Sequence, residues 1–286
     1  MKLPSVEVVG APVTALKLND QVDLMVEWGK QRLSKVVCVA NVHMLMESQH
    51  NGHLKRVLDS ADLVTPDGMP LVWMMRLLGE DSQDRVAGMD IFEKACKLSQ
   101  EKDVSIYLIG STQSVLDSIE ARLRRDFPNL KIAGLESPPF RELSAQEDEA
   151  VVERINSSGA GITFVALGCP KQERWMSAHQ GRIKSVMVGV GGVFPVYAGL
   201  QKHAPKWTRD FGLEWSYRLM QEPRRLFGRY SSTIPPFIYL AVKQLALAKI
   251  LQRQPSGASD ISNNASAISS ELSPDISKGL SLRLRN

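Results

Sequence analysis

Short apolar runs alternate with longer amphipathic stretches along the chain as far as residue 190. The apolar runs are rich in Val and Ile and nearly uninterrupted, which is typical of strands buried on both faces of a parallel sheet. The longer stretches repeat their apolar positions at helical spacing. This alternation predicts a doubly wound, Rossmann-like α/β fold with a mainly parallel sheet and helices on both of its faces. The predicted strands are 35–40, 62–65, 104–109, 131–134, 161–167 and 185–190, and the predicted helices are 16–33, 69–78, 91–101, 113–126, 145–156 and 172–179.

Two of these helices have candidate N-cap residues. Asp90 directly precedes residue 91, and Ser144 precedes residue 145 with Glu147 three positions further on. A side-chain oxygen at this position accepts a hydrogen bond from the first helical turn. We therefore expect Asp90 and Ser144 to start their helices.

The pattern changes after residue 190. A helix is predicted over 207–221, and Pro223 either ends it or begins another. The pair Pro235-Pro236 then precedes an apolar stretch of about 15 residues, which is short for a membrane span and suits a helix lying on an apolar surface. Nine of the last 31 residues are serine, a composition typical of disorder. The predicted organisation is an α/β catalytic core (1–200), a basic helical, membrane-proximal appendage (201–254) and a disordered Ser-rich tail (255–286).

The net charge of +4 is unevenly distributed. Residues 201–253 hold ten Lys or Arg against three acids, a net +7, so the remainder of the chain is −3. The basic segment indicates an anionic partner, although a solvated basic face and a face against anionic lipid are both consistent with it. We predict no nucleic-acid partner, and homo-oligomerisation stays open.

The cysteine pattern and the chain start indicate a cytoplasmic location. The three cysteines form no C-x-x-C pair, which argues against a disulfide framework or a zinc site. The first residues lack the apolar run of a signal peptide, and no stretch reaches about 18 uninterrupted apolar residues.

Glycine and polar residues follow five of the six predicted strands. In an open parallel sheet, ligands bind just beyond the carboxyl ends of the strands. Turn geometry would explain any single glycine, but their joint occurrence at one edge favours a ligand cleft. Backbone N–H groups there suit a nucleotide diphosphate, although no complete G-x-G-x-x-G or Walker A motif is present. The candidate cleft residues are Asn41, Gly68, Gly110, Gly168, Lys171, Gln172, Gly189, Gly191 and Gly192.

Asp67 and Arg85 are the candidate charged residues of this edge. Asp67 lies between Pro66 and Gly68, where it is either a turn-forming Asp or a general base that takes a proton from an attacking hydroxyl. Arg85 precedes a predicted helix start, where it either faces the cleft or is solvated.

No D-x-D carboxylate pair, the usual metal-bridging motif of sugar transferases, occurs in the chain. We therefore predict neither metal nor cofactor. A departing diphosphate would then be stabilised by cationic side chains or by helix N-termini. The candidates are Arg218, Arg224, Arg225 and Arg229, with Glu214 able to pair with Arg218 at i,i+4.

A series of ordered motifs extends over roughly residues 15–230. They are the Asn41 region, ADLVTPDG (61–68), RVAGMD (85–90), LGCPKQE (167–173), VGVGGVF (188–194), Ala198-Gly199 with Ala204-Pro205, and LEWSYR (213–218) with QEPRR (221–225). Together these motifs resemble the WecG/TagA/CpsF glycosyltransferases. One position departs from the family pattern: Val39 stands where the family often has threonine.

The resemblance implies an inverting, metal-independent transfer of a hexose-type sugar from a UDP-sugar donor. The acceptor would be an undecaprenyl-diphosphate-linked sugar, in surface or exopolysaccharide biosynthesis, with the enzyme peripheral on the inner face of the bacterial membrane. Asp67 would be the base, Asn41, Arg85 and Gln172 would line the pocket, and C-terminal arginines such as Arg218 and Arg225 would close over the diphosphate.

Two other functions stay open. A nicotinamide-dependent oxidoreductase needs an acidic residue about 20 positions past a glycine motif at the end of the next strand. Asp210 lies near that distance but inside the basic helical region. In a non-catalytic membrane adaptor, the basic segment would be the whole function.

Overall fold

The structure is a computed structural model that describes residues 3–202, 204–205, 208 and 212–253. The side chains of Arg225 and of residues 251–253 are outside that description. Residues 1–242 form one compact unit, and a second begins at Lys243. The predicted tail over 255–286 lies outside the described residues, and the domain boundary placed after residue 200 stays a prediction.

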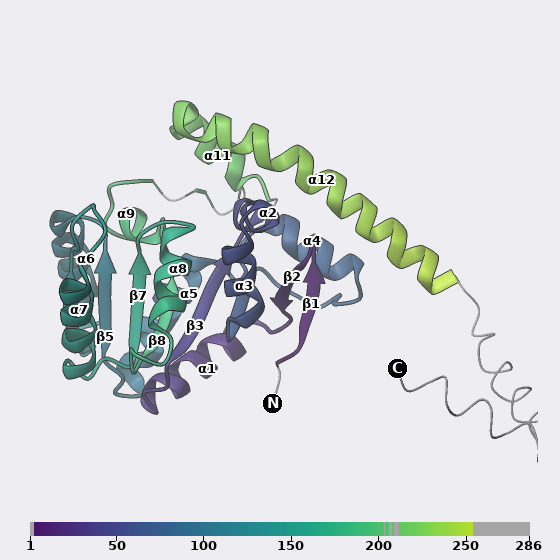
Figure 1. Cartoon of the computed structure of the whole chain (residues 1–286). Coiled ribbons are helices and arrows are strands. Elements are labelled where there is room, and N and C mark those ends of the chain that lie inside the picture. The colour runs from purple at the N-terminus through teal and green to yellow at the C-terminus, as the bar shows by residue number, and fades with distance from the viewer. Residues whose placement is uncertain (1–2, 203, 206–207, 209–211, 254–286) are drawn as a thin grey trace, which may run out of the picture. The chain divides into compact units, whose positions relative to one another are not determined.

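A six-stranded sheet with the order β4-β3-β8-β7-β5-β6 forms the centre of the first unit (Figure 1). All neighbouring strands in it are parallel. Five of the strands are buried at nearly every position, as a sheet covered on both faces requires. All six predicted strands and the predicted fold class are confirmed. The strands are β3 (Lys35–Ala40), β4 (Leu63–Pro66), β5 (Ile106–Gly110), β6 (Ile132–Glu136), β7 (Ile162–Ala166) and β8 (Val186–Gly189).

Helices cover both faces of the sheet (Figure 1). On one face, Phe92 lies edge-on to Phe164 of the sheet and to Tyr197, with ring centroids 4.8 and 5.0 Å apart. On the other face, His179 Nε2 lies 2.9 Å from Asp148 Oδ1 and joins two helices. The first face carries α1 (Leu18–Lys30), α5 (Gly88–Glu101), α6 (Gln113–Asp126) and α9 (Val193–Tyr197), and the second carries α3 (Gly52–Ser60), α7 (Ala145–Ser157) and α8 (Lys171–His179).

Sequence patterning missed α2 (Val42–His50), α3, α9 and an N-terminal hairpin. The hairpin pairs β1 (Ser5–Val8) with β2 (Ala11–Thr14) through a turn in which both Val9 and Gly10 have positive φ. Each strand has only four residues, too few for a clear alternation. The hairpin covers the outer edge of β4, where the Val64 N–H donates to Thr14 Oγ1 at 3.0 Å.

One predicted helix cap is confirmed and the other is wrong. Ser144 Oγ accepts a hydrogen bond from Glu147 N, and the Glu147 carboxylate accepts one from Ser144 N at 2.8 Å, which forms a capping box at α7. Helix α5 begins at Gly88 instead of after Asp90, so Asp90 lies inside its first turn. Asp67 replaces Asp90 as the acceptor at this helix end, because its Oδ1 accepts from Gly88 N at 3.1 Å.

Helices α11 (Glu214–Gln221) and α12 (Pro223–Arg253) follow the sheet. The predicted helix over 207–221 is confirmed from Glu214 onward, residues 212–213 are not helical, and residues 207 and 209–211 lie outside the described part of the chain. Pro235 and Pro236 do not interrupt α12. They remove two backbone donors, but Ser231 and Ser232, whose carbonyls lose these partners, are exposed to water. Within the described residues, no helix is long and apolar enough to cross a bilayer.

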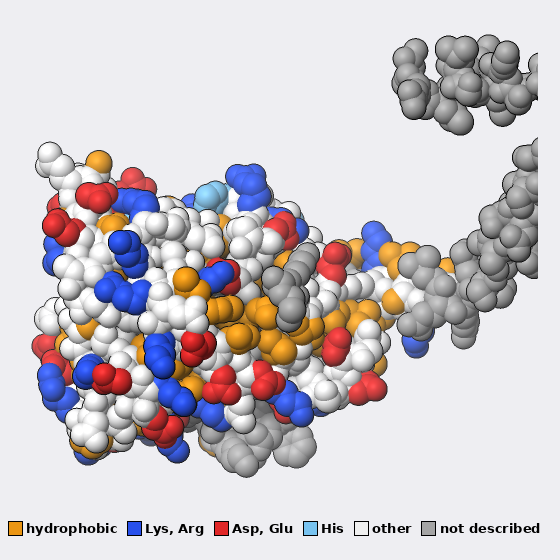
Figure 2. Space-filling view, turned by 90° about the horizontal axis from the view of Figure 1, so that it is seen from below, with side chains coloured by type: hydrophobic (Ala, Val, Ile, Leu, Met, Phe, Trp, Pro, Cys, Tyr) orange, Lys and Arg blue, Asp and Glu red, His pale blue; other side chains and the backbone are white. Residues whose placement is uncertain are grey.

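The α/β core shows no surface of a single charge sign on the face drawn in Figure 2. Acidic and basic side chains are interspersed there. This mixture agrees with the small net charge of the chain outside residues 201–253.

Candidate active site

A pocket of about 250 Å³ lies over the carboxyl ends of four neighbouring strands, β4, β3, β8 and β7. It lies at the edge where the strand-end pattern predicts a ligand cleft. Helix α2 (Val42–His50), the start of α5, α11 and α12 contribute the other walls. The predicted residues that line it are Asn41, Asp67, Arg85, Gly168, Gln172, Gly189, Gly191, Gly192, Arg218 and Arg229.

Four other predicted site residues are not among those that line this pocket. Gly68 is the N-cap of α4 (Met69–Leu77), and Lys171 and Arg224 are exposed at the starts of α8 and α12. Gly110 ends β5, where a Cβ would lie 2.5 Å from the Ala166 carbonyl oxygen. Its glycine is therefore explained by close backbone packing. The side chain of Arg225 lies outside the described part of the chain.

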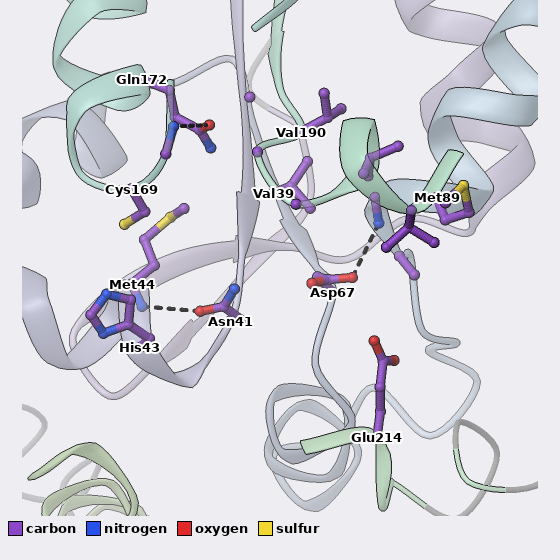
Figure 3. A pocket seen from close by; sticks show the side chains of 18 of the residues that line it. Val39, Asn41, His43, Met44, Asp67, Met89, Cys169, Gln172, Val190 and Glu214 are labelled. Atoms are coloured by element: carbon purple, nitrogen blue, oxygen red, sulfur yellow. Dashed lines mark hydrogen bonds between the residues drawn. The ribbon is translucent and has the colours of Figure 1, made fainter. Parts of the chain in front are cut away.

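Asp67 follows β4 directly and faces the pocket (Figure 3). Its backbone N–H donates to Ala40 O at 2.9 Å, which ties the turn to the end of β3. The carboxylate accepts from Gly88 N, 21 residues away, instead of from a neighbouring turn residue. Burial raises the pKa of Asp67, and the negative charge of Glu214 adds to this rise. The positive charges of Arg85 and Arg218 and the Gly88 hydrogen bond act in the opposite direction.

Asn41 follows β3 and is the N-cap of α2. Its Oδ1 accepts from Met44 N at 3.2 Å, the bond drawn in Figure 3. The capping bond fixes this side chain at the pocket wall between β3 and α2. Val39, the position where the family often has threonine, also lines the pocket, so that departure lies within it.

Arg85 and Arg218 share one carboxylate. Glu214 Oε2 accepts from Arg85 Nη1 at 2.7 Å, and its Oε1 lies 2.7 Å from Arg218 Nη2. The predicted i,i+4 pair of Glu214 and Arg218 is confirmed. The Arg85 side chain is only 13% exposed, so its alternative interpretation as a solvated arginine is wrong. The Arg85–Glu214 pair spans 129 positions, and no local sequence signal connects the two residues.

Gln172 is held in a tight slot between two strand ends. Its Oε1 accepts from Gly168 N at 3.2 Å, and its Nε2 donates to buried Glu173 at 2.8 Å. A Cβ at Gly189 would lie 3.0 Å from Gln172 Nε2, and one at Gly191, where φ is +43°, would lie 3.2 Å from Oε1. These glycines therefore leave room for the Gln172 amide, a role that their spacing alone did not indicate.

Sequence reasoning did not select His43 or Glu173. His43 lines the pocket, and burial together with Arg229 lowers its pKa, which favours the neutral imidazole at neutral pH. Burial raises the pKa of Glu173, and the hydrogen bond from Gln172 acts in the opposite direction. His43 lies three positions after the predicted strand 35–40, and this position at the cleft edge of the sheet was the sequence signal that could have identified it.

The described residues contain no group of three or more His, Cys, Asp or Glu placed to hold a metal ion. The charged side chains that line the pocket are three arginines and two carboxylates. Such a lining can bind an anionic ligand through the guanidinium groups and can place a carboxylate beside a reacting hydroxyl.

Comparison with known proteins connects this geometry to a family. A relative from Bacillus spizizenii (strain ATCC 23059 / NRRL B-14472 / W23) is 32% identical over 74% of this chain and 80% of its own length. One from Bacillus subtilis (strain 168) is 30% identical over 75% and 81%, and one from Staphylococcus aureus (strain MW2) is 32% identical over 68% and 74%. All three are described as N-acetylglucosaminyldiphosphoundecaprenol N-acetyl-beta-D-mannosaminyltransferases. The family model of the WecG/TagA/CpsF glycosyl transferases matches residues 6–250, and the chain belongs to this family.

Proposed function

We propose that the protein transfers a hexose-type sugar from a UDP-sugar to an undecaprenyl-diphosphate-linked acceptor with inversion at the anomeric carbon, in bacterial surface or exopolysaccharide biosynthesis. The observation that carries this proposal is the pocket at the sheet edge of a member of this family. It brings the Asp67 carboxylate together with Arg85, Arg218 and Arg229.

The proposed step is a single displacement. Asp67 takes the proton of the acceptor hydroxyl while the hydroxyl oxygen forms a bond to the anomeric carbon of the donor. The bond from that carbon to the diphosphate oxygen breaks, and UDP leaves with the electron pair. Arg218 and Arg229 stabilise the charge that develops on the leaving diphosphate in this proposal. Its support is that both line the pocket and that guanidinium groups bind phosphate through paired N–H donors. Arg225 is proposed for the same role from its sequence position alone.

Metal-independent transfer is part of the proposal. Its support is the lack of a D-x-D pair in the sequence together with the arginine-rich lining of the pocket. Transfer should continue at the same rate after treatment with excess EDTA. Loss of activity that Mg²⁺ or Mn²⁺ restores would contradict this part.

The decisive experiment is a donor screen. The purified protein would be incubated with a short-chain prenyl-diphosphate-linked N-acetylglucosamine and a panel of UDP-sugars, beginning with UDP-N-acetylmannosamine because of the relatives' descriptions. We expect one donor to give an acceptor heavier by one sugar and an equal amount of UDP. Calorimetry should show tighter binding of UDP than of NAD. Absence of product with every donor, or tighter NAD binding, would refute the proposal.

The C-terminal segment is proposed to rest on the anionic inner face of the membrane. Its support is the net +7 charge of residues 201–253, together with exposed apolar side chains on α12, among them Phe227, Ile238, Tyr239 and Val242. Binding to vesicles with anionic lipid should exceed binding to neutral vesicles and should fall with added salt. Equal binding to both vesicle types would contradict it.

A further inference from the structure

Glu214 lies in the pocket, but the proposed transfer step does not use it. Its two carboxylate oxygens each meet a different arginine at 2.7 Å. Arg85 comes from the loop before α5, and Arg218 lies one turn after Glu214 on α11. One carboxylate therefore connects the edge of the sheet to the C-terminal segment.

This double contact orients both cations. A guanidinium has five N–H donors in one plane, so a bond through one nitrogen fixes that plane and leaves other donors for a phosphate. Arg218 is half-exposed, and its long side chain would otherwise be free to adopt other rotamers. Without the carboxylate, the two like charges would also repel each other. Glu214 thus holds two arginines at one place.

The pocket keeps a positive balance despite Glu214. The charged residues that line it are Arg85, Arg218 and Arg229 against Asp67 and Glu214. An excess of one positive charge remains to attract an anionic donor. Glu214 therefore orients the cations without neutralising the site.

Glu214 also acts on Asp67. Figure 3 shows the Glu214 carboxylate pointing toward Asp67 from the opposite wall. Its negative charge raises the pKa of Asp67, next to the larger effect of burial, while Arg85 and Arg218 lower it. The charged and titratable groups that line the pocket with Asp67 are Arg85 from the loop before α5, Glu214 and Arg218 from α11, Arg229 from α12, His43 from α2 and Cys169 from the loop before α8.

We infer that Glu214 is a positioning residue, which holds Arg85 and Arg218 in the orientation that receives the donor diphosphate and sets the charge that Asp67 experiences. This inference rests on the proposed function. In this inference, α11 affects the charge around Asp67 and also holds an arginine that meets the leaving diphosphate.

Glu214→Gln tests the inference, because it removes the charge and keeps the size of the side chain. We expect the KM for the UDP-sugar to rise by about tenfold, the equivalent of one weakened ionic contact. In the plot of kcat against pH, the acid limb should move to lower pH, because Asp67 would lose its proton more readily beside a neutral amide. A residue that only supported the fold would leave this limb in place.

Asp84→Asn is the matched control. Asp84 is the sequence neighbour of Arg85, and its side chain is 65% exposed and pairs with Arg76 at 3.5 Å. Its loss removes one negative charge near the same loop but in solvent, where charges are screened. It should leave both the KM and the acid limb unchanged. If Glu214→Gln does not fold, Glu214→Asp retracts the charge and should move the limb in the same direction by less.

An acid limb that does not move, or moves to higher pH, would overturn the inference. So would a lower KM in Glu214→Gln, which would mean that Glu214 competes with the diphosphate. A carboxyl ¹³C NMR titration of Asp67 in the wild type and in Glu214→Gln gives a readout that needs no turnover. If the wild type transfers no sugar but this titration shifts, the proposed function fails and the effect of Glu214 on Asp67 stands.

Discussion

The two sides of the pocket are held in place by different forces. Asp67 and Asn41 follow β4 and β3, whose residues are almost all buried and paired with neighbouring strands. Helix α11, which supplies Arg218, buries none of its residues. On that side, position depends on charge, above all on the contact of Glu214 with Arg85. Packing therefore fixes Asp67 and Asn41, whereas ion pairs hold Arg218 in place. Salt and pH should therefore affect the two sides differently.

The largest effect should come from the packed side. Asp67→Asn should lower kcat by about 10²–10⁴-fold, the usual contribution of a general base. Asn keeps an oxygen that can accept from Gly88 N, so the helix start should be preserved. Initial rates with the donor found in the screen would measure the loss, with unchanged circular dichroism as control. A variant that keeps wild-type turnover would remove Asp67 from the mechanism.

Substitution of two phenylalanines tests how much the α/β core and α12 each contribute to the free energy of unfolding. Phe92 is fully buried among aromatic rings, whereas Phe227 on α12 is 68% exposed. Phe92→Ala should lower the free energy of unfolding by about 3–5 kcal/mol through lost burial and a cavity. Phe227→Ala should change it by about 0.5 kcal/mol or less and should weaken binding to anionic vesicles. Urea denaturation and vesicle sedimentation measure the two effects, and equal destabilisation would contradict the comparison.

Arg218→Ala tests the side held by charge. If Arg218 stabilises the leaving diphosphate as proposed, its loss should lower kcat by about 10²-fold, the effect of removing one stabilising donor. Arg124→Ala, which removes an exposed arginine of α6, should have no effect. The loss of kcat in Arg218→Ala should depend on salt more strongly than the loss in Asp67→Asn, because Arg218 is half-exposed. The same salt dependence for both variants would contradict this difference.

The smallest expected effect is a pH-dependent gain in stability. The pKa of Asp67 is raised in the folded state, so the folded protein binds more protons than the unfolded one above the ordinary value of 3.8. Its contribution to stability is full below that value and is lost as pH rises through the folded pKa. Asp67→Asn should therefore melt at a higher temperature than the wild type at neutral pH and should show no such gain near pH 3. Calorimetric melting at both pH values measures this, and an equal difference at both would contradict it.

The sheet and the location of the pocket could be predicted because both depend on local signals. Continuous Val-rich runs such as 35–40 can be buried only inside a covered sheet, and polar residues at their ends must then meet at one edge. The hairpin was missed because its four-residue strands carry too little pattern. The link between Arg85 and Glu214 was missed because only the folded chain brings positions 129 apart together.

The glycines show where pattern reasoning gave an incomplete answer. Gly189 and Gly191 were predicted to face a diphosphate, and both line the pocket. Each also gives space to the Gln172 amide, a contact between two strand ends that no spacing rule contains. Gly110 looked equivalent in sequence, but it makes room for the backbone of β7.

The β1–β2 hairpin protects an edge of the sheet from pairing with other chains. Strand β4 ends the sheet, and all four of its residues are buried. An apolar strand with an uncovered rim is a template on which other chains can add and aggregate. The hairpin covers that edge, and Thr14 Oγ1 accepts the hydrogen bond that the Val64 N–H donates. Residues 5–14 therefore protect the folded protein from aggregation by covering this edge of the sheet.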